Sequence, residues 1–180
     1  MTRKTINTRT IFTTVLTIVM IDLIAQSDLS GRSREELSEL AFFVGEWEGS
    51  ATTQGPQGSS ASLVQESISW DLDSTVLVIS GTGVHQESGE IVHDARAMMY
   101  FDHDQEQLMM HSFLKNGRNT LSMVEVTGPE TFKWWIDLPN GGKMTFYLSF
   151  AGGNWSEQGV YSSPEGQEYQ TISMDLTRID

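Results

Sequence analysis

From Trp47 to the end of the 180-residue chain, short runs of β-branched and aromatic residues alternate with turn signals at close and fairly even spacing. Such runs predict β-strands, and the Gly, Pro and Asn residues between them predict turns. The predicted strands cover residues 47–54, 62–70, 75–84, 93–101, 108–114, 120–126, 131–137, 144–150, 155–161 and 169–178. Connections this short cannot cross over a sheet, so neighbouring strands must run antiparallel in an up-and-down order. A sheet of about ten such strands avoids exposed edges by closing, which predicts an all-β fold, an antiparallel up-and-down β-barrel.

A short helix is predicted before the first strand. Ser33 is a suitable N-cap, and Glu36 stands three residues later, where it would complete a capping box. The helix would run on to Phe43, with Leu37 and Leu40 on one apolar face.

The first 27 residues have the order of a secretory signal peptide. Residues 1–10 are polar and basic, residues 11–25 are mostly apolar, and Ala25 and Ser27 place small side chains at the two positions that a signal peptidase reads. An uncleaved membrane anchor is the alternative, but the apolar run is shorter than the roughly 20 residues that a bilayer span requires. We therefore predict cleavage after Ser27, export to the periplasm or the medium, and a single barrel domain over residues 28–180.

The composition excludes several classes of partner. The chain has 11 basic and 24 acidic residues, a formal net charge of -13, and no cluster of Lys or Arg that would reverse the charge locally. Such a surface repels phosphate backbones and anionic membranes, so we expect neither nucleic acid nor stable membrane insertion. The absence of cysteine excludes disulfides, thiolate metal sites and a lipidated N-terminal cysteine.

The common catalytic and metal-binding motifs are missing from the sequence. It has no Gly-x-Ser-x-Gly, no His-Glu-x-x-His and no P-loop. The acidic loop 101–106 lacks the glycine and the distal glutamate of an EF-hand loop, so we interpret it as a solvated hairpin turn. We therefore expect no metal site, and any catalysis would depend on carboxylates, His or Tyr inside the barrel.

The period of two indicates which polar side chains could face the interior. In the second strand Glu66 and Trp70 lie on an otherwise apolar face, and in the ninth strand Trp155, Glu157 and Tyr161 share another. A carboxylate on an apolar face must be paired, protonated or in contact with water in a cavity. These two faces therefore supply the first candidates for a binding site.

Two further strands could add a cation and an imidazole. Arg96 shares a face with Tyr100, and His111 lies between apolar residues in the same way. If the faces converge, Arg96 is a natural counter-charge for Glu66 or Glu157. The candidate ligand-binding residues are Glu66, Trp70, Arg96, His111, Trp155, Glu157 and Tyr161. The alternative is that they face outward, on strands whose faces are assigned wrongly, or form a satisfied internal salt bridge.

The two ends of the predicted barrel carry a pair of short motifs. Gly45-Glu46-Trp47 follows the helix, and Leu176-Thr177-Arg178 lies on the last strand. Together they resemble the Gly-x-Trp and the arginine of calycin barrels, the group of lipocalins and fatty-acid-binding proteins. The resemblance implies that Trp47 and Arg178 are structural, with the guanidinium stacked on the indole at the closed end.

The chain over residues 35–178 also resembles a bacterial family of uncharacterised lipocalin-like domains of unknown function. The resemblance rests on Trp70-Asp71-Leu72-Asp73, Val92-His93-Asp94 and Tyr100-Phe101-Asp102. It implies the fold and little about the ligand.

Nitrobindin-like haem barrels also begin with Gly-x-Trp and use a histidine near the C-terminal end as iron ligand. The four histidines of this chain are His85, His93, His103 and His111, all in its middle. We therefore expect no haem and no other cofactor.

Three functions are compatible with such a barrel. We expect a binding protein for a small apolar or amphipathic ligand, because barrels of this size enclose one such molecule and nine methionines suit an adaptable lining. One alternative is an isomerase- or cyclase-like enzyme that uses an internal carboxylate as general acid/base. The other is a barrel filled by its own side chains that acts only as an interaction module.

The signal peptide gives a direct test. The mature protein should begin near Asp28 and be found outside the cytoplasm, which intact-mass measurement on native extracts would show. A soluble cytoplasmic form that retains Met1 would contradict the prediction.

Overall fold

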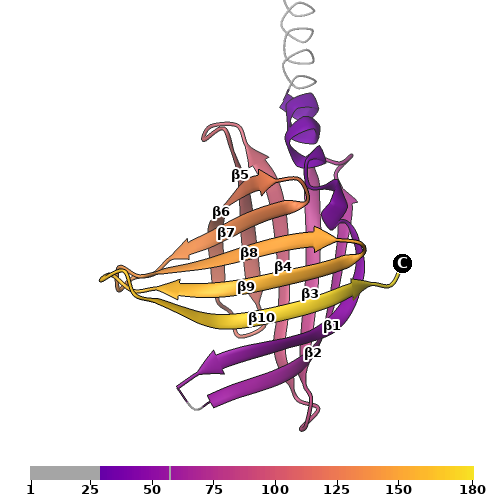
Figure 1. Cartoon of the computed structure of the whole chain (residues 1–180). Helices are drawn as coiled ribbons and strands as arrows, with labels where there is room; N and C mark the ends of the chain where they lie inside the picture. Colours follow the sequence, from indigo (N-terminus) through magenta and orange to yellow (C-terminus); the bar gives the residue numbers. More distant parts are fainter. Residues whose placement is uncertain (1–28, 57) are drawn as a thin grey trace, which may run out of the picture.

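In the computed structural model, which describes residues 29–56 and 58–180, ten strands form one closed antiparallel barrel (Figure 1). The strands are β1 (Gly45–Gly55), β2 (Gly58–Asp71), β3 (Val76–His85), β4 (Ile91–Asp102), β5 (Gln107–Leu114), β6 (Asn119–Gly128), β7 (Thr131–Asp137), β8 (Lys143–Ala151), β9 (Asn154–Ser162) and β10 (Glu168–Arg178). Each strand pairs with its neighbours in the chain, and β1 also pairs with β10, which closes the sheet. The predicted fold class is confirmed, and each predicted strand overlaps the strand observed there. The predicted signal peptide lies outside the described residues.

A helix over residues 29–38 and a short 3₁₀-helix, η1 (Ala41–Phe43), lie at one end of the barrel (Figure 1). Two ion pairs fasten the helix to hairpin turns: Arg34 Nη1 lies 2.8 Å from Asp73 Oδ2, and Arg32 Nη1 lies 3.1 Å from Glu106 Oε1. We call this end the closed end. Within the described residues, no helix combines the length and the apolar character needed to cross a membrane.

The predicted capping box at Ser33 is wrong. Residues 29–32 are already helical, so Ser33 lies inside the helix, and its Oγ is 3.0 Å from His103 Nε2. The hydroxyl therefore bonds to the β4–β5 turn rather than to an N–H of its own helix. The helix also stops before Phe43, because turn residues 39–40 separate it from η1.

Trp47 and Arg178 meet at the closed end, as the calycin resemblance implies. They are register partners on β1 and β10, and the Arg178 guanidinium carbon lies 4.3 Å from the centre of the Trp47 ring. The guanidinium donates hydrogen bonds to the Val44 and Phe42 carbonyls at 2.6 and 2.8 Å. A Cβ on Gly45 would collide with Arg178 Nη1, so the glycine before the tryptophan leaves room for the arginine.

The interior changes in character along the barrel. Around the closed end the inward side chains form a tight aromatic cluster in which Trp47 and Trp155 meet edge to face at 5.8 Å, next to Phe43 and Phe150. Further along, inward side chains such as Ile136, Met144 and Ile172 are only partly buried. The closed end is thus packed by its own side chains, and the remainder of the interior is more accessible.

Replacing Trp47 by Ala should lower the free energy of unfolding by about 3–5 kcal/mol, because the change leaves a cavity and removes the stacking partner of Arg178. Chemical denaturation measures this loss. Trp135, on the outer face of β7, is the matched control, and its replacement by Ala should cost much less. A Trp47→Ala protein that unfolds where the wild type does would contradict the role given to this pair.

Candidate functional site

Two carboxyl side chains lie inside the barrel beside the closed-end cluster. Glu66 on β2 is the register partner of Trp47 and lies between the buried Val64 and Ile68 on the inner face. Glu157 on β9 stands two residues after the buried Trp155, so it lies on the same inner face. Both predicted inward faces are therefore correct, on β2 and on β9.

The Glu66 side chain extends across the inner face of β3. Glu66 and Gly81 are register partners, and a Cβ on Gly81 would collide with both carboxylate oxygens. A glycine at this position thus makes room for the carboxyl group. Burial raises the pKa of Glu66 from 4.5 to about 7, and the charge of Arg96 opposes the rise.

Glu157 is more strongly perturbed. Its pKa is raised from 4.5 to about 8, mainly by burial and also by the negative charge of Glu66, while the side chain of Trp155 opposes the rise. The effect of Glu66 means that the two carboxyls interact across the interior. Since ionisation of one disfavours ionisation of the other, the pair holds at least one proton near neutral pH.

In the described part of the chain, no cation stands beside the carboxyl pair. Among the described residues, no Lys, Arg or His nitrogen lies within 4.0 Å of either carboxylate. Two buried polar atoms of the described chain also lack a hydrogen-bond partner, the Trp155 indole Nε1 and Ser122 Oγ. Trp155 Nε1 is close enough to Glu157 to affect its pKa but makes no well-formed hydrogen bond with it.

Arg96 and His111 do not belong to this site. On β4 the buried residues are Ala97, Met99 and Phe101, so Arg96 points outward, with 58% of its side chain exposed and its Nη1 3.1 Å from Asp94 Oδ1. On β5 the register puts His111 on the outer face as well, where Nε2 lies 3.3 Å from Asn119 Oδ1. The prediction that these two side chains face the interior is wrong. Arg96 acts on Glu66 only as a charge on the other side of the barrel wall.

The three remaining candidates face inward in different surroundings. Trp155 is part of the closed-end aromatic cluster, and Trp70 packs against the same core. Tyr161 lies toward the other end of β9, where its hydroxyl accepts a hydrogen bond from Asn140 Nδ2 at 3.2 Å. Of the seven predicted residues, the structure therefore brings Glu66, Trp155 and Glu157 together.

Further inward polar residues were missed by the sequence reasoning. Ser122 on β6 is 1% exposed and Ser62 on β2 is 8% exposed. His93 on β4 is the register partner of Gly83 but remains exposed to solvent. The described residues include no group of three or more His, Cys, Asp or Glu side chains that could hold a metal ion.

Comparison with known proteins supports the fold assignment. No protein family model matches the chain, and no curated protein matches its sequence. Among solved structures, Rv2717c from M. tuberculosis is similar, with a TM-score of 0.60 over 80% of this chain and 97% of that one. The fold is that of a calycin-like barrel. At 12% sequence identity the similarity concerns the fold alone.

The raised pKa values of Glu66 and Glu157 predict that the folded protein loses stability as the pH rises. Below about pH 4.5 both carboxyls are protonated in the folded and the unfolded chain. Between about pH 4.5 and 8 the unfolded chain releases protons that the folded chain retains, so the free energy of unfolding falls. For a group shifted as far as Glu66 the fall is about 3 kcal/mol.

Urea denaturation at about pH 5 and about pH 8.5 measures this effect. The double variant Glu66→Gln/Glu157→Gln should lose most of the decline, because an amide does not ionise. Glu48→Gln, on the outer face of β1, controls for the change in net charge. An equal decline in wild type and double variant would show that the interior pair is not responsible.

Proposed function

We propose that this protein binds a small amphipathic molecule inside its barrel, outside the cytoplasm, with the polar head of the ligand against Glu66 and Glu157. The observation that carries the proposal is the pair of inward, partly buried carboxyl groups, which has no basic group within 4.0 Å among the described residues. Burying such groups without partners is costly, and a ligand that donates hydrogen bonds to them offsets that cost.

The chemistry of the inner face supports an apolar body for the ligand. Next to the carboxyls, Trp134 and Phe146 stack with ring centres 3.9 Å apart, and Met144 and Ile172 are only partly buried. Aromatic and methionine side chains with a few polar groups among them are typical of small-molecule sites.

The polar groups also indicate the kind of head group. Glu66 and Glu157 offer acceptor oxygens and Ser122 a hydroxyl, whereas Trp155 Nε1 is a donor without a partner. An ammonium or other hydrogen-bond donor suits the carboxyls, and an anionic head would be repelled by them. The ligand class that fits best is a neutral or cationic amphiphile.

An acid/base enzyme is the second candidate, and one observation favours it. A carboxyl whose pKa is about 7, such as Glu66, can both give and take a proton at neutral pH, which is the property of an efficient general acid/base. In that case Glu66→Gln would abolish turnover of the bound molecule while leaving its binding intact.

Displacement of the fluorophore N-phenyl-1-naphthylamine by decylamine and by decanoate tests the binding proposal. The two competitors share an apolar chain and differ in the sign of the head group. We expect decylamine to bind the wild type, and Glu66→Gln/Glu157→Gln to weaken it by roughly tenfold or more, as for loss of a charge-assisted hydrogen bond.

Mass spectra of molecules extracted from the native wild-type protein and from the double variant complement the fluorophore-displacement experiment.

In the displacement experiment, decanoate should bind more weakly than decylamine to the wild type, and Glu48→Gln should behave like the wild type. The proposal fails if neither competitor nor fluorophore binds, or if both competitors bind equally and the double variant changes nothing.

A further inference from the structure

The barrel wall is incomplete between β6 and β7. The two strands pair only from Met123, opposite Trp135, to Gly128, opposite Thr131. Residues 119–122 still pair with β5, and residues 136–137 still pair with β8, but the two segments do not pair with each other. The backbone groups that would bridge them are left without a ladder partner, which is unusual in a closed barrel.

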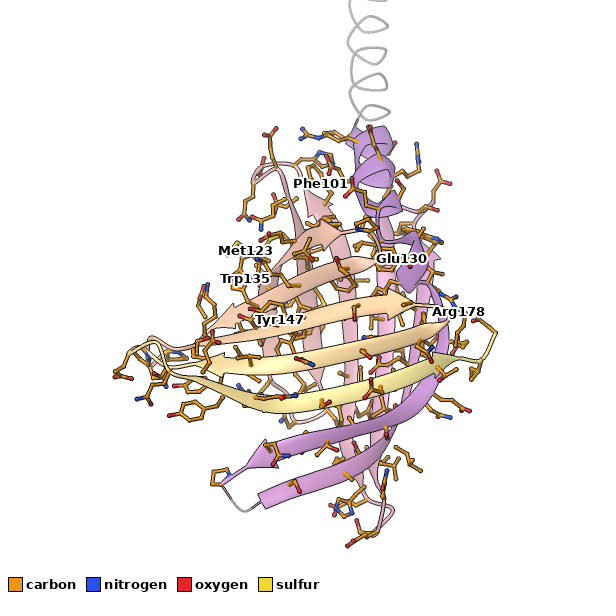
Figure 2. The ribbon with its side chains drawn as sticks, viewed as in Figure 1. Phe101, Met123, Glu130, Trp135, Tyr147 and Arg178 are labelled. Atoms are coloured by element: carbon orange, nitrogen blue, oxygen red, sulfur yellow. The ribbon has the colours of Figure 1, made fainter. Side chains whose placement is uncertain are left out.

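A groove of about 520 Å³ lies at this separation. Its lining includes Thr120 and Ile136, which lie on the inner face of their strands. It also includes Met109, Met123 and Trp135, which lie on the outer face. Successive side chains of one strand point to opposite faces of the sheet, so one groove can contact both sets only by passing around the strand edge. Figure 2 shows Met123 and Trp135 together at this part of the wall.

The inner residues beyond the groove are less buried than those of the closed end. Ile136 and Trp134 are partly accessible, whereas Phe132, further along the same strand, is 1% exposed. From Ile136 the inner face continues to Met144 on β8, whose register partner on β9 is Tyr161. In the next inward row Trp134 is opposite Phe146, and Phe146 is opposite Gly159, which has no side chain and stands two residues from Glu157. The path from the groove to the carboxyl pair is therefore lined by apolar residues and Gly159, with Tyr161 beside it.

We propose that the separation of β6 and β7 is the entrance by which a small amphipathic ligand reaches the barrel interior, with its apolar part passing between Trp135 and Leu121. This inference rests on the proposed function and adds the route to the site. The volume suits one such molecule, since small-molecule sites measure about 300–1,000 Å³. The apolar groove floor, Met109 and Met123, contacts the chain of the ligand before its head reaches the carboxyls.

A reversible cross-link across the separation tests the entrance. If the β6–β7 register is continued, Leu121 falls opposite Asp137, and the chain has no cysteine of its own. In Leu121→Cys/Asp137→Cys, oxidation should slow uptake of N-phenyl-1-naphthylamine in stopped flow by about tenfold or more, and reduction should restore it. The control pair Thr52→Cys/Ser173→Cys staples β1 to β10, which already pair there, and should leave uptake unchanged.

A single substitution covers the case in which the cross-link does not form or the variant does not fold. Leu121→Arg puts a charge at the mouth and should slow uptake of the neutral fluorophore. Leu63→Arg is its control, since Leu63 is 57% and Leu121 is 53% exposed. Equal uptake rates in Leu121→Arg and Leu63→Arg, or in Leu121→Cys/Asp137→Cys before and after reduction of a cross-link shown by mass to have formed, overturn the entrance and leave the binding proposal intact. Absence of fluorophore binding in the wild type overturns the binding proposal itself.

Discussion

The stacking of Arg178 on Trp47 is the contact on which the rest of the barrel depends. It joins the last strand to the first, so it lies at the seam where the sheet closes. The same guanidinium bonds to carbonyls at Val44 and Phe42, which fixes the segment leading from the helices into β1. The Trp47 indole N–H donates to the Phe43 carbonyl at 3.1 Å, so both partners of the stack hold this segment. One cation–π pair thus ties together the sheet closure and the cover of the closed end.

The position of the carboxyl pair follows from this arrangement. Glu66 is opposite Trp47 in the β1–β2 register, and Glu157 is two residues from Trp155, so both lie where the aromatic cluster ends. A rigid apolar floor behind them limits hydration on one side, which is the physical cause of their raised pKa values. The aromatic cluster that stabilises the fold is therefore also the source of the raised pKa values of Glu66 and Glu157.

The fold was predictable because two local signals agreed along the whole chain. The period of two and the turn residues together specified hairpins, and hairpins leave few topologies open. The two inward carboxyls were predictable for a similar reason: on β2, the neighbours of Glu66 at alternate positions are apolar, and those on the other face, such as Gln65 and Ser67, are polar.

Arg96 and His111 were misplaced because the sequences of β4 and β5 are apolar on both faces. Met98 and Met99 are adjacent on β4 and point to opposite faces. On β5, Met109 is only 4% exposed even though it lies on the outer face. On such strands the period gives no preferred face. The bulge where Gly83 pairs with His93 but Val84 pairs with Ile91 shifts the alternation again. No sequence pattern predicted the separation of β6 and β7, because it depends on where the hydrogen-bond ladder between the two strands stops.

The separation of β6 and β7 accounts for apolar residues on the outer face of β5 to β7. Met109, on the outer face of β5, is only 4% exposed and lines the groove together with Met123 and Trp135. On a fully paired barrel the same residue would be exposed to solvent, and a polar side chain would serve there equally well. The apolar character of both faces, which obscured the register in the sequence, is thus what the wall requires if an apolar molecule is to cross it. The packed closed end and the splayed wall then divide the barrel into a part that sets the electrostatics of the carboxyl pair and a part that, in our proposal, admits the ligand.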